Sequence, residues 1–107
     1  MNDTTEDFVF VCNVTDLRPG SMRTFVVTGK QIALANVDGD FFAVDDTCTY
    51  EQCSLGTEGA LDGNVIICGC HGAQYDVTTG AVTAPPAPRD IRSYETKLEK
   101  DGVYINV

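Results

Sequence analysis

The chain has 107 residues, the size of one domain with a single hydrophobic core. Its apolar content of 43% excludes a largely disordered chain, and its formal net charge of −9 disfavours a nucleic-acid partner, because a phosphate backbone attracts basic surfaces. No apolar run approaches the roughly 20 residues that cross a bilayer, and the acidic start lacks the order of a signal peptide. We therefore expect a soluble, cytoplasmic, single-domain protein with a polar tail over residues 1–7 and no membrane partner.

The β pattern runs through most of the chain outside its middle. Apolar and β-branched runs are separated by turn signals, and Asp38-Gly39-Asp40 and Lys100-Asp101-Gly102 are typical of hairpins. One helical turn is expected at residues 15–18, before Pro19. Regular short strands of this kind predict a small β-sandwich or barrel. The expected strands are residues 8–12, 21–28, 30–37, 41–45, 93–99 and 103–107.

Residues 46–88 differ from the sequence on either side. They contain four of the five cysteines, the only histidine and six of the ten glycines. This composition predicts rigid loops around a site, with little contribution to the core. We interpret the segment as an insertion between strands of the β framework and not as a separate domain. Cys12 stands apart from the cluster, and a lone cysteine on an apolar strand is usually an inert part of the core.

The chemically distinctive residues lie in two short segments, Cys48-Thr-Tyr-Glu-Gln-Cys53 and Cys68-Gly-Cys70-His71-Gly72-Ala73. Thiolates and an imidazole gathered from two loops suit an iron–sulfur cluster or a zinc ion. Without an export signal, a metal or redox site is favoured over a secreted disulfide framework. The sequence shows no acid/base pair of a catalytic site, so we expect a protein that is not itself an enzyme.

This layout resembles the Rieske-type [2Fe–2S] ferredoxins, especially the small carriers that serve ring-hydroxylating dioxygenases. In that family two thiolates hold one iron and two imidazoles hold the other. The resemblance covers nearly the whole chain and implies an all-β Rieske fold, with a β-sandwich base and a small cluster-binding subdomain at about residues 46–88. The matching segments are Asp46–Thr49, Ser54–Gly59, Leu61–Val65, Cys70–Asp76, Thr79–Gly80, the proline-rich loop and the closing Asp-Gly hairpin.

Carried over position by position, the resemblance assigns Cys48 and Cys68 to the inner iron and His71 to the outer iron. The second imidazole position holds Tyr50, and the chain has no other histidine. Three outcomes stay open at this point. Tyr50 binds the outer iron as a phenolate, another cysteine completes the site, or the cluster is lost and the fold remains as a binding module.

The cysteine that could complete the site is Cys53 or Cys70. In the Rieske subunits of respiratory cytochrome bc complexes, these two positions form a disulfide between the cluster loops. The resemblance thus implies a bridge or a close thiol pair, which competes with either cysteine acting as a ligand. It also matches Tyr75 to a tyrosine that bonds a cysteine sulfur, and it places Ala73 where high-potential members carry a serine. Fewer hydrogen bonds to the cluster imply a lower potential than in the respiratory proteins.

The implied function is one-electron transfer by a monomer, from a flavin-dependent ferredoxin reductase to a terminal oxygenase. The alternative is a cluster-free or altered-cluster binding module that resembles the small subunit of some assimilatory nitrite reductases. A mononuclear zinc or iron site is the third hypothesis. Retention of Cys48, Cys68 and His71 favours the carrier, whereas Tyr50 favours the module.

Overall fold

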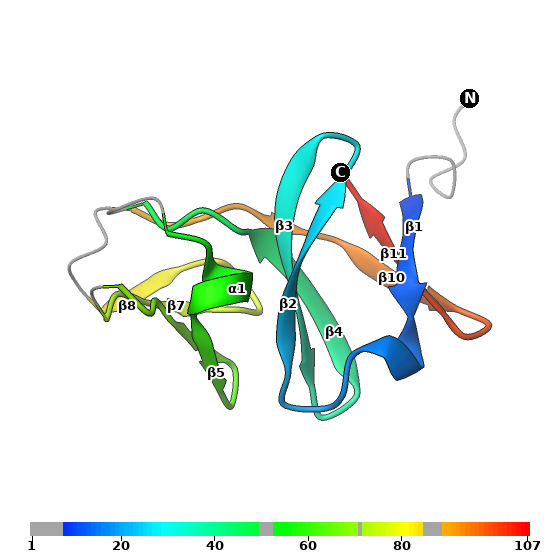
Figure 1. The fold of residues 1–107 in the computed structure, drawn as a ribbon, viewed down its shortest axis with the longest axis horizontal. Coiled ribbons are helices and arrows are strands. Elements are labelled where there is room, and N and C mark those ends of the chain that lie inside the picture. Colours follow the sequence, from blue (N-terminus) through cyan, green and yellow to red (C-terminus); the bar gives the residue numbers. More distant parts are fainter. Residues whose placement is uncertain (1–7, 50–52, 71, 85–88) are drawn as a thin grey trace.

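The computed structural model describes residues 8–49, 53–70, 72–84 and 89–107, which form three antiparallel β-sheets (Figure 1). No helix in these ranges is long and apolar enough to span a membrane. The strands are β1 (Phe8–Asn13), β2 (Met22–Val27), β3 (Lys30–Val37), β4 (Asp40–Asp45), β5 (Ala60–Asp62), β6 (Val65–Ile67), β7 (Gln74–Asp76), β8 (Val82–Ala84), β9 (Ser93–Tyr94), β10 (Thr96–Glu99) and β11 (Gly102–Asn106). Two short helices, η2 (Val14–Asp16) and α1 (Leu55–Glu58), complete the fold.

The base consists of two sheets, with strand orders β1-β11-β10 and β2-β3-β4-β9. This confirms the strands expected from the alternating pattern, with one difference. The expected strand at 93–99 is two strands, because β9 pairs with β4 while β10 pairs with β11. The chain thus crosses from one sheet to the other at Glu95. The single turn expected at 15–18 is the 3-10 turn η2, which ends two residues earlier.

Strand β3 is buried on both faces, and its alternating side chains belong to two separate cores. Ile32 and Leu34 pack into the core between the base sheets, whereas Ala33 and Ala35 pack toward the middle segment. Each large apolar side chain buried in this way contributes about 1.5–3 kcal/mol. Cys12 lies in the first of these cores, as expected, and burial raises the pKa of its thiol.

The middle segment forms a third sheet, with strand order β5-β6-β7-β8. The expectation of loops with little core is therefore wrong. Leu55, Ile66, Tyr75 and Val77 are fully buried, and they pack with the alanine face of β3. Strands of three residues contain too few alternations to be recognised in a sequence, and here glycine turns separate them.

The third sheet and α1 lie at one end of the molecule, and β1, β10 and β11 lie at the other (Figure 1). The segment that carries the third sheet leaves the base after β4 and returns as β9. Because β4 and β9 pair with each other, through Ala43 and Tyr94 and through Val44 and Ser93, both connections start from neighbouring strands. This topology places the two cysteine-bearing segments on the third sheet's side of the base.

Candidate metal centre

The two cysteine-bearing segments have the same local construction. In the first, the Cys48 N–H donates to the Cys53 carbonyl at 2.9 Å, and in the second the Cys68 N–H donates to the Ala73 carbonyl at 2.7 Å. Each hydrogen bond joins the first residue of a six-residue loop to the last. We call residues 48–53 loop 1 and residues 68–73 loop 2. Cys48 and Cys68 thus hold equivalent positions, each at the start of its loop.

The thiols of Cys48 and Cys68 are buried, at 1% and 2% relative exposure. They belong to one apolar cluster with Leu55 and Tyr75, so the two loops deliver soft sulfur donors to one shielded region. Two thiolates from separate loops are the donor set that holds one iron of a cluster with mixed sulfur and imidazole ligands. In this respect the described residues fit the site that the sequence predicts.

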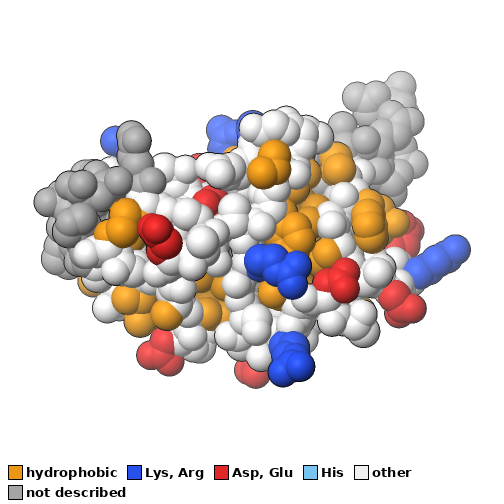
Figure 2. Space-filling view, in the orientation of Figure 1, with side chains coloured by type: hydrophobic (Ala, Val, Ile, Leu, Met, Phe, Trp, Pro, Cys, Tyr) orange, Lys and Arg blue, Asp and Glu red, His pale blue; other side chains and the backbone are white. Residues whose placement is uncertain are grey.

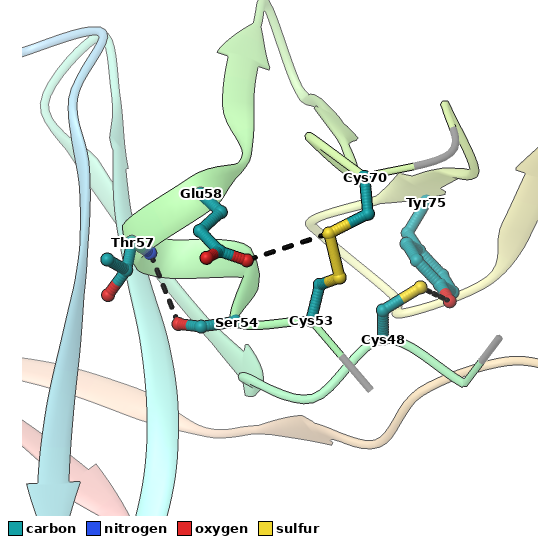
Figure 3. Close-up of a disulfide and its surroundings, with 7 residues drawn as sticks. All are labelled: Cys48, Cys53, Ser54, Thr57, Glu58, Cys70 and Tyr75. Atoms are coloured by element: carbon teal, nitrogen blue, oxygen red, sulfur yellow. Dashed lines mark hydrogen bonds between the residues drawn. A yellow bond between two sulfur atoms is a disulfide. The ribbon is translucent and has the colours of Figure 1, made fainter. Parts of the chain in front are cut away.

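A disulfide between Cys53 and Cys70 joins loop 1 to loop 2, with Cα atoms 6.5 Å apart (Figure 3). This matches the pairing that the family resemblance implied. The Sγ atom of Cys68 lies within 4.8 Å of both bridge sulfurs, so the two loops do fold toward each other. In the bridged form neither Cys53 nor Cys70 offers a thiolate, and of these three cysteines only Cys68 can act as a ligand.

Tyr75 rises from β7 under loop 1 and is fully buried. Its hydroxyl lies 3.4 Å from Cys48 Sγ (Figure 3), accepts from the Thr49 N–H at 3.0 Å and lies 3.0 Å from Thr49 Oγ1. Burial, followed by the Cys48 thiol, raises the pKa of this phenol, so the proton stays on the oxygen. The side chain therefore both packs beneath loop 1 and places its hydroxyl against the Cys48 sulfur.

Replacing Tyr75 with phenylalanine is expected to lower the free energy of unfolding by about 1–3 kcal/mol, because polar groups of Thr49 lose a buried partner. Loss of a donor near the Cys48 sulfur is also expected to lower the midpoint potential of a bound cluster. Urea unfolding and a redox titration measure the two effects. Tyr104→Phe is the matched control, since the Tyr104 ring packs edge-on against Phe10 on the base. Equal losses in both variants would contradict the role of the hydroxyl.

Ala73 closes loop 2 and is fully buried, with its carbonyl used by Cys68. The methyl side chain of Ala73 carries no hydrogen-bond donor that could reach a cluster sulfur. Tyr50 and His71, the expected ligands of the outer iron, lie outside the described residues. Their assignment therefore still rests on the sequence.

Loop 2 packs closely on the end of α1 at Gly69. A methyl group at this position would lie 1.7 Å from the Glu58 carbonyl oxygen, so only glycine allows the two backbones to approach. We expect Gly69→Ala to push loop 2 away from α1 and to lower the free energy of unfolding by about 1–3 kcal/mol. Chemical denaturation measures this loss, and a variant as stable as the parent would show that loop 2 adjusts freely.

Asp46 is a buried residue that the sequence analysis missed as part of the site. Its carboxylate, in a residue 1% exposed, accepts hydrogen bonds from Thr24 Oγ1 at 2.8 Å, from Ser54 Oγ at 2.6 Å and from the Gly56 N–H at 2.8 Å. Thr24 belongs to β2, whereas Ser54 caps α1. The carboxylate therefore joins the base to the residues on both sides of loop 1. An aspartate directly after an apolar strand and two residues before Cys48 was the only sequence signal of this role.

Two buried thiols, a bridge between their loops and a tyrosine hydroxyl on one sulfur together indicate a cluster site. Residues 7–95 match the protein family described as the Rieske [2Fe–2S] domain. The chain belongs to the Rieske [2Fe–2S] family. The observed fold agrees with this assignment, since the antiparallel base carries a smaller sheet that supports the two Rieske loops.

Several Rieske proteins are similar to this chain over nearly its full length. The biphenyl 2,3-dioxygenase ferredoxin component of Rhodococcus jostii (strain RHA1) is 38% identical over 97 residues, which cover 91% of this chain and 90% of that protein. The biphenyl dioxygenase ferredoxin subunit of Pseudomonas sp. (strain KKS102) is 34% identical over 99 residues, covering 92% and 91%. A chain from the complex of reduced oxygenase and oxidized ferredoxin in carbazole 1,9a-dioxygenase superposes with a TM-score of 0.87 at 34% identity, covering 94% and 93%.

The Rieske fold also extends to a protein described as the small subunit of an NADPH nitrite reductase. It superposes with a TM-score of 0.80, covering 94% of this chain and 98% of that chain, but at 16% identity. At that level the likeness shows the fold alone. It therefore does not favour the binding-module hypothesis over the carrier.

Proposed function

We propose that this Rieske protein is a one-electron carrier of a ring-hydroxylating oxygenase system. The observation that carries the proposal is the pair of buried thiols, Cys48 and Cys68, delivered by two bridged loops at one end of the molecule. They would hold the inner iron of a [2Fe–2S] cluster, and His71 and Tyr50 would hold the outer iron. When bound, the cluster supplies one-electron redox chemistry.

The protein's own residues would tune and steady that site. The Tyr75 hydroxyl, 3.4 Å from Cys48 Sγ, would stabilise the additional negative charge of the reduced state. The Cys53–Cys70 bridge and the Asp46 carboxylate hold the loops from two sides, so we expect little movement of the ligands between redox states. The chain needs no acid/base pair for this task, which fits a carrier that is not itself an enzyme.

The partners we propose are a flavin-dependent ferredoxin reductase as donor and a terminal oxygenase as acceptor, met by a cytoplasmic monomer. The carbazole system supports the second partner, because a similar chain there is described in complex with its oxygenase. Acidic and basic side chains are interspersed on the face in Figure 2, so the net charge of −9 acts as a general field more than as one patch on that face. Such a field favours a basic partner and predicts association that weakens with salt.

Iron and acid-labile sulfide assays on the purified protein test the proposal. A [2Fe–2S] carrier contains about two of each per chain. One metal ion without sulfide would instead indicate a mononuclear site, and neither would indicate a cluster-free module. Electron paramagnetic resonance of the reduced protein then identifies oxygen, sulfur or nitrogen at the outer iron. Sulfur there would require a reduced bridge.

Tyr50→His is expected to restore the two-imidazole ligand set of the family. A neutral imidazole in place of an anionic phenolate should raise the midpoint potential, because the oxidised irons carry more positive charge and a phenolate stabilises them more. Redox titration of the loaded protein measures the shift, and Tyr104→Phe controls for loss of a tyrosine elsewhere. An unchanged potential and an unchanged spectrum would mean that residue 50 is not a ligand.

A further inference from the structure

The Cys53–Cys70 bridge lies at the surface, with Cys53 partly buried and Cys70 exposed. An oxygen of the Glu58 carboxylate lies 3.6 Å from Cys70 Sγ (Figure 3). A disulfide sulfur carries no hydrogen, so this contact is not a hydrogen bond in the bridged protein. Glu58 also has no ion-pair partner among the residues that the structure describes. Among the described residues, the contact therefore places a carboxylate without an ion-pair partner beside the more exposed sulfur of the bridge.

The backbone holds Glu58 in this place from two directions. Its N–H donates to the Ser54 carbonyl at 2.9 Å within α1, and its carbonyl packs against Gly69 of loop 2. Gly69 directly precedes Cys70 in the chain. Because helix and loop are in backbone contact, the carboxylate stays near the bridge even though its side chain is exposed.

We propose that Glu58 makes the bridge selective for the charge of an attacking thiol. In the first step a thiolate attacks the exposed Cys70 sulfur, forms a mixed disulfide with it and releases Cys53 as a thiolate. A second thiolate attacks the mixed disulfide, releases Cys70 and leaves as the oxidised disulfide of the reagent. Two reagent thiols are thus oxidised and the bridge gains two electrons. The Glu58 carboxylate repels the thiolate sulfur of any reagent at the first step. An ammonium group on the reagent offsets this repulsion, whereas carboxylates on the reagent add to it.

The effect follows from Coulomb's law near a wet surface. Two unit charges about 5 Å apart at the dielectric constant of water change a rate by roughly fourfold, and partial burial of the bridge increases the factor. We expect a change of about three- to tenfold at low ionic strength, falling toward none at 1 M salt, where the screening length is about 3 Å. Glutathione, which is anionic, would then be a poor reductant of this bridge, and the bridge would persist longer in a glutathione-rich compartment.

The test compares the intact chain with Glu58→Gln, and it does not depend on the carrier proposal. The bridge is reduced with glutathione or with cysteamine, whose ammonium lies beside its thiol, and the free thiols are alkylated and counted by mass at each time. We expect Glu58→Gln to raise the rate of bridge reduction by glutathione about three- to tenfold per thiolate. The rate of reduction by cysteamine should fall or stay unchanged. The effect of the variant on the two reduction rates should disappear at high salt.

Two further variants make the result decisive. Glu95→Gln gives the chain the same net charge as Glu58→Gln, and residue 95 is exposed in the connection between β9 and β10. We expect this variant to change neither reduction rate noticeably. Glu58→Asp keeps the charge and should retain slow reduction by glutathione. Equal acceleration of both reagents by Glu58→Gln would mean that the variant only loosens the loops. No change with either reagent would mean that the carboxylate does not act on the bridge, and either outcome overturns the proposal.

Discussion

Replacing Asp46 with alanine is expected to lower the free energy of unfolding by roughly 3–5 kcal/mol, measured by urea denaturation. The variant removes a buried acceptor of three hydrogen bonds and leaves two hydroxyls and the Gly56 N–H without it. Hydrogen bonds to a charged group contribute about 1.5–3 kcal/mol each, and a buried donor left unpaired costs a similar amount. The three share one acceptor, so their contributions are less than additive.

The neighbouring aspartate provides the matched control. The Asp45 carboxylate accepts from the Tyr94 hydroxyl at 2.5 Å and from the Arg92 N–H at 3.3 Å, but Asp45 is only partly buried. We expect Asp45→Ala to cost about 1 kcal/mol, since water can replace its partners. That variant should also lower the pKa of Tyr94, which burial and Asp45 together raise to about 12. Similar losses in the two variants would contradict a special role for Asp46.

The Asp46 variant should also affect the metal centre. The Asp46 carboxylate binds Ser54 Oγ and the Gly56 N–H, which follow loop 1, while Asp46 itself lies two residues before Cys48, so its side chain ties the two ends of loop 1 together. We expect the variant to retain less iron and sulfide per chain, even when it is folded at low temperature. The double variant with Thr24→Val should lose less than the sum of the two single variants, because both act through one network.

The sequence predicted the strands of the base but neither the third sheet nor Asp46, and the reasons are physical. The base strands have enough alternations to show which side chains face inward, as Ile32 and Leu34 do. The strands of the third sheet have three residues each, with one buried side chain between two partly buried ones in β6 and β7. In the sequence Asp46 resembles a polar loop residue, because its hydrogen-bond partner Thr24 lies 22 positions away. The proximity of the two loops came from the family resemblance, since spacing alone does not fix it.

Removing the bridge with Cys53→Ala and Cys70→Ala is expected to lower the free energy of unfolding by about 3 kcal/mol. The bridge closes a chain segment of 17 residues, and a loop of that size restricts the unfolded chain by about this amount. Denaturation with and without a reductant measures the effect. Parent and variant should converge when the reductant is present, because the parent then also lacks the bridge. A difference that persists under reduction would indicate lost packing in place of a lost cross-link.

Hydrogen exchange distinguishes whether the bridge stabilises only against global unfolding or also against separate opening of the third sheet. If the bridge stabilises only by restricting the fully unfolded chain, every amide that exchanges through global unfolding loses the same protection, including those of β3 in the base. If the third sheet also opens on its own, the amides of Cys48 and Cys68, which close the two loops, lose more protection than β3. We expect the second pattern, because the strands of the third sheet have only three residues each. The bridge would then keep loop 1 and loop 2 closed while the base stays folded.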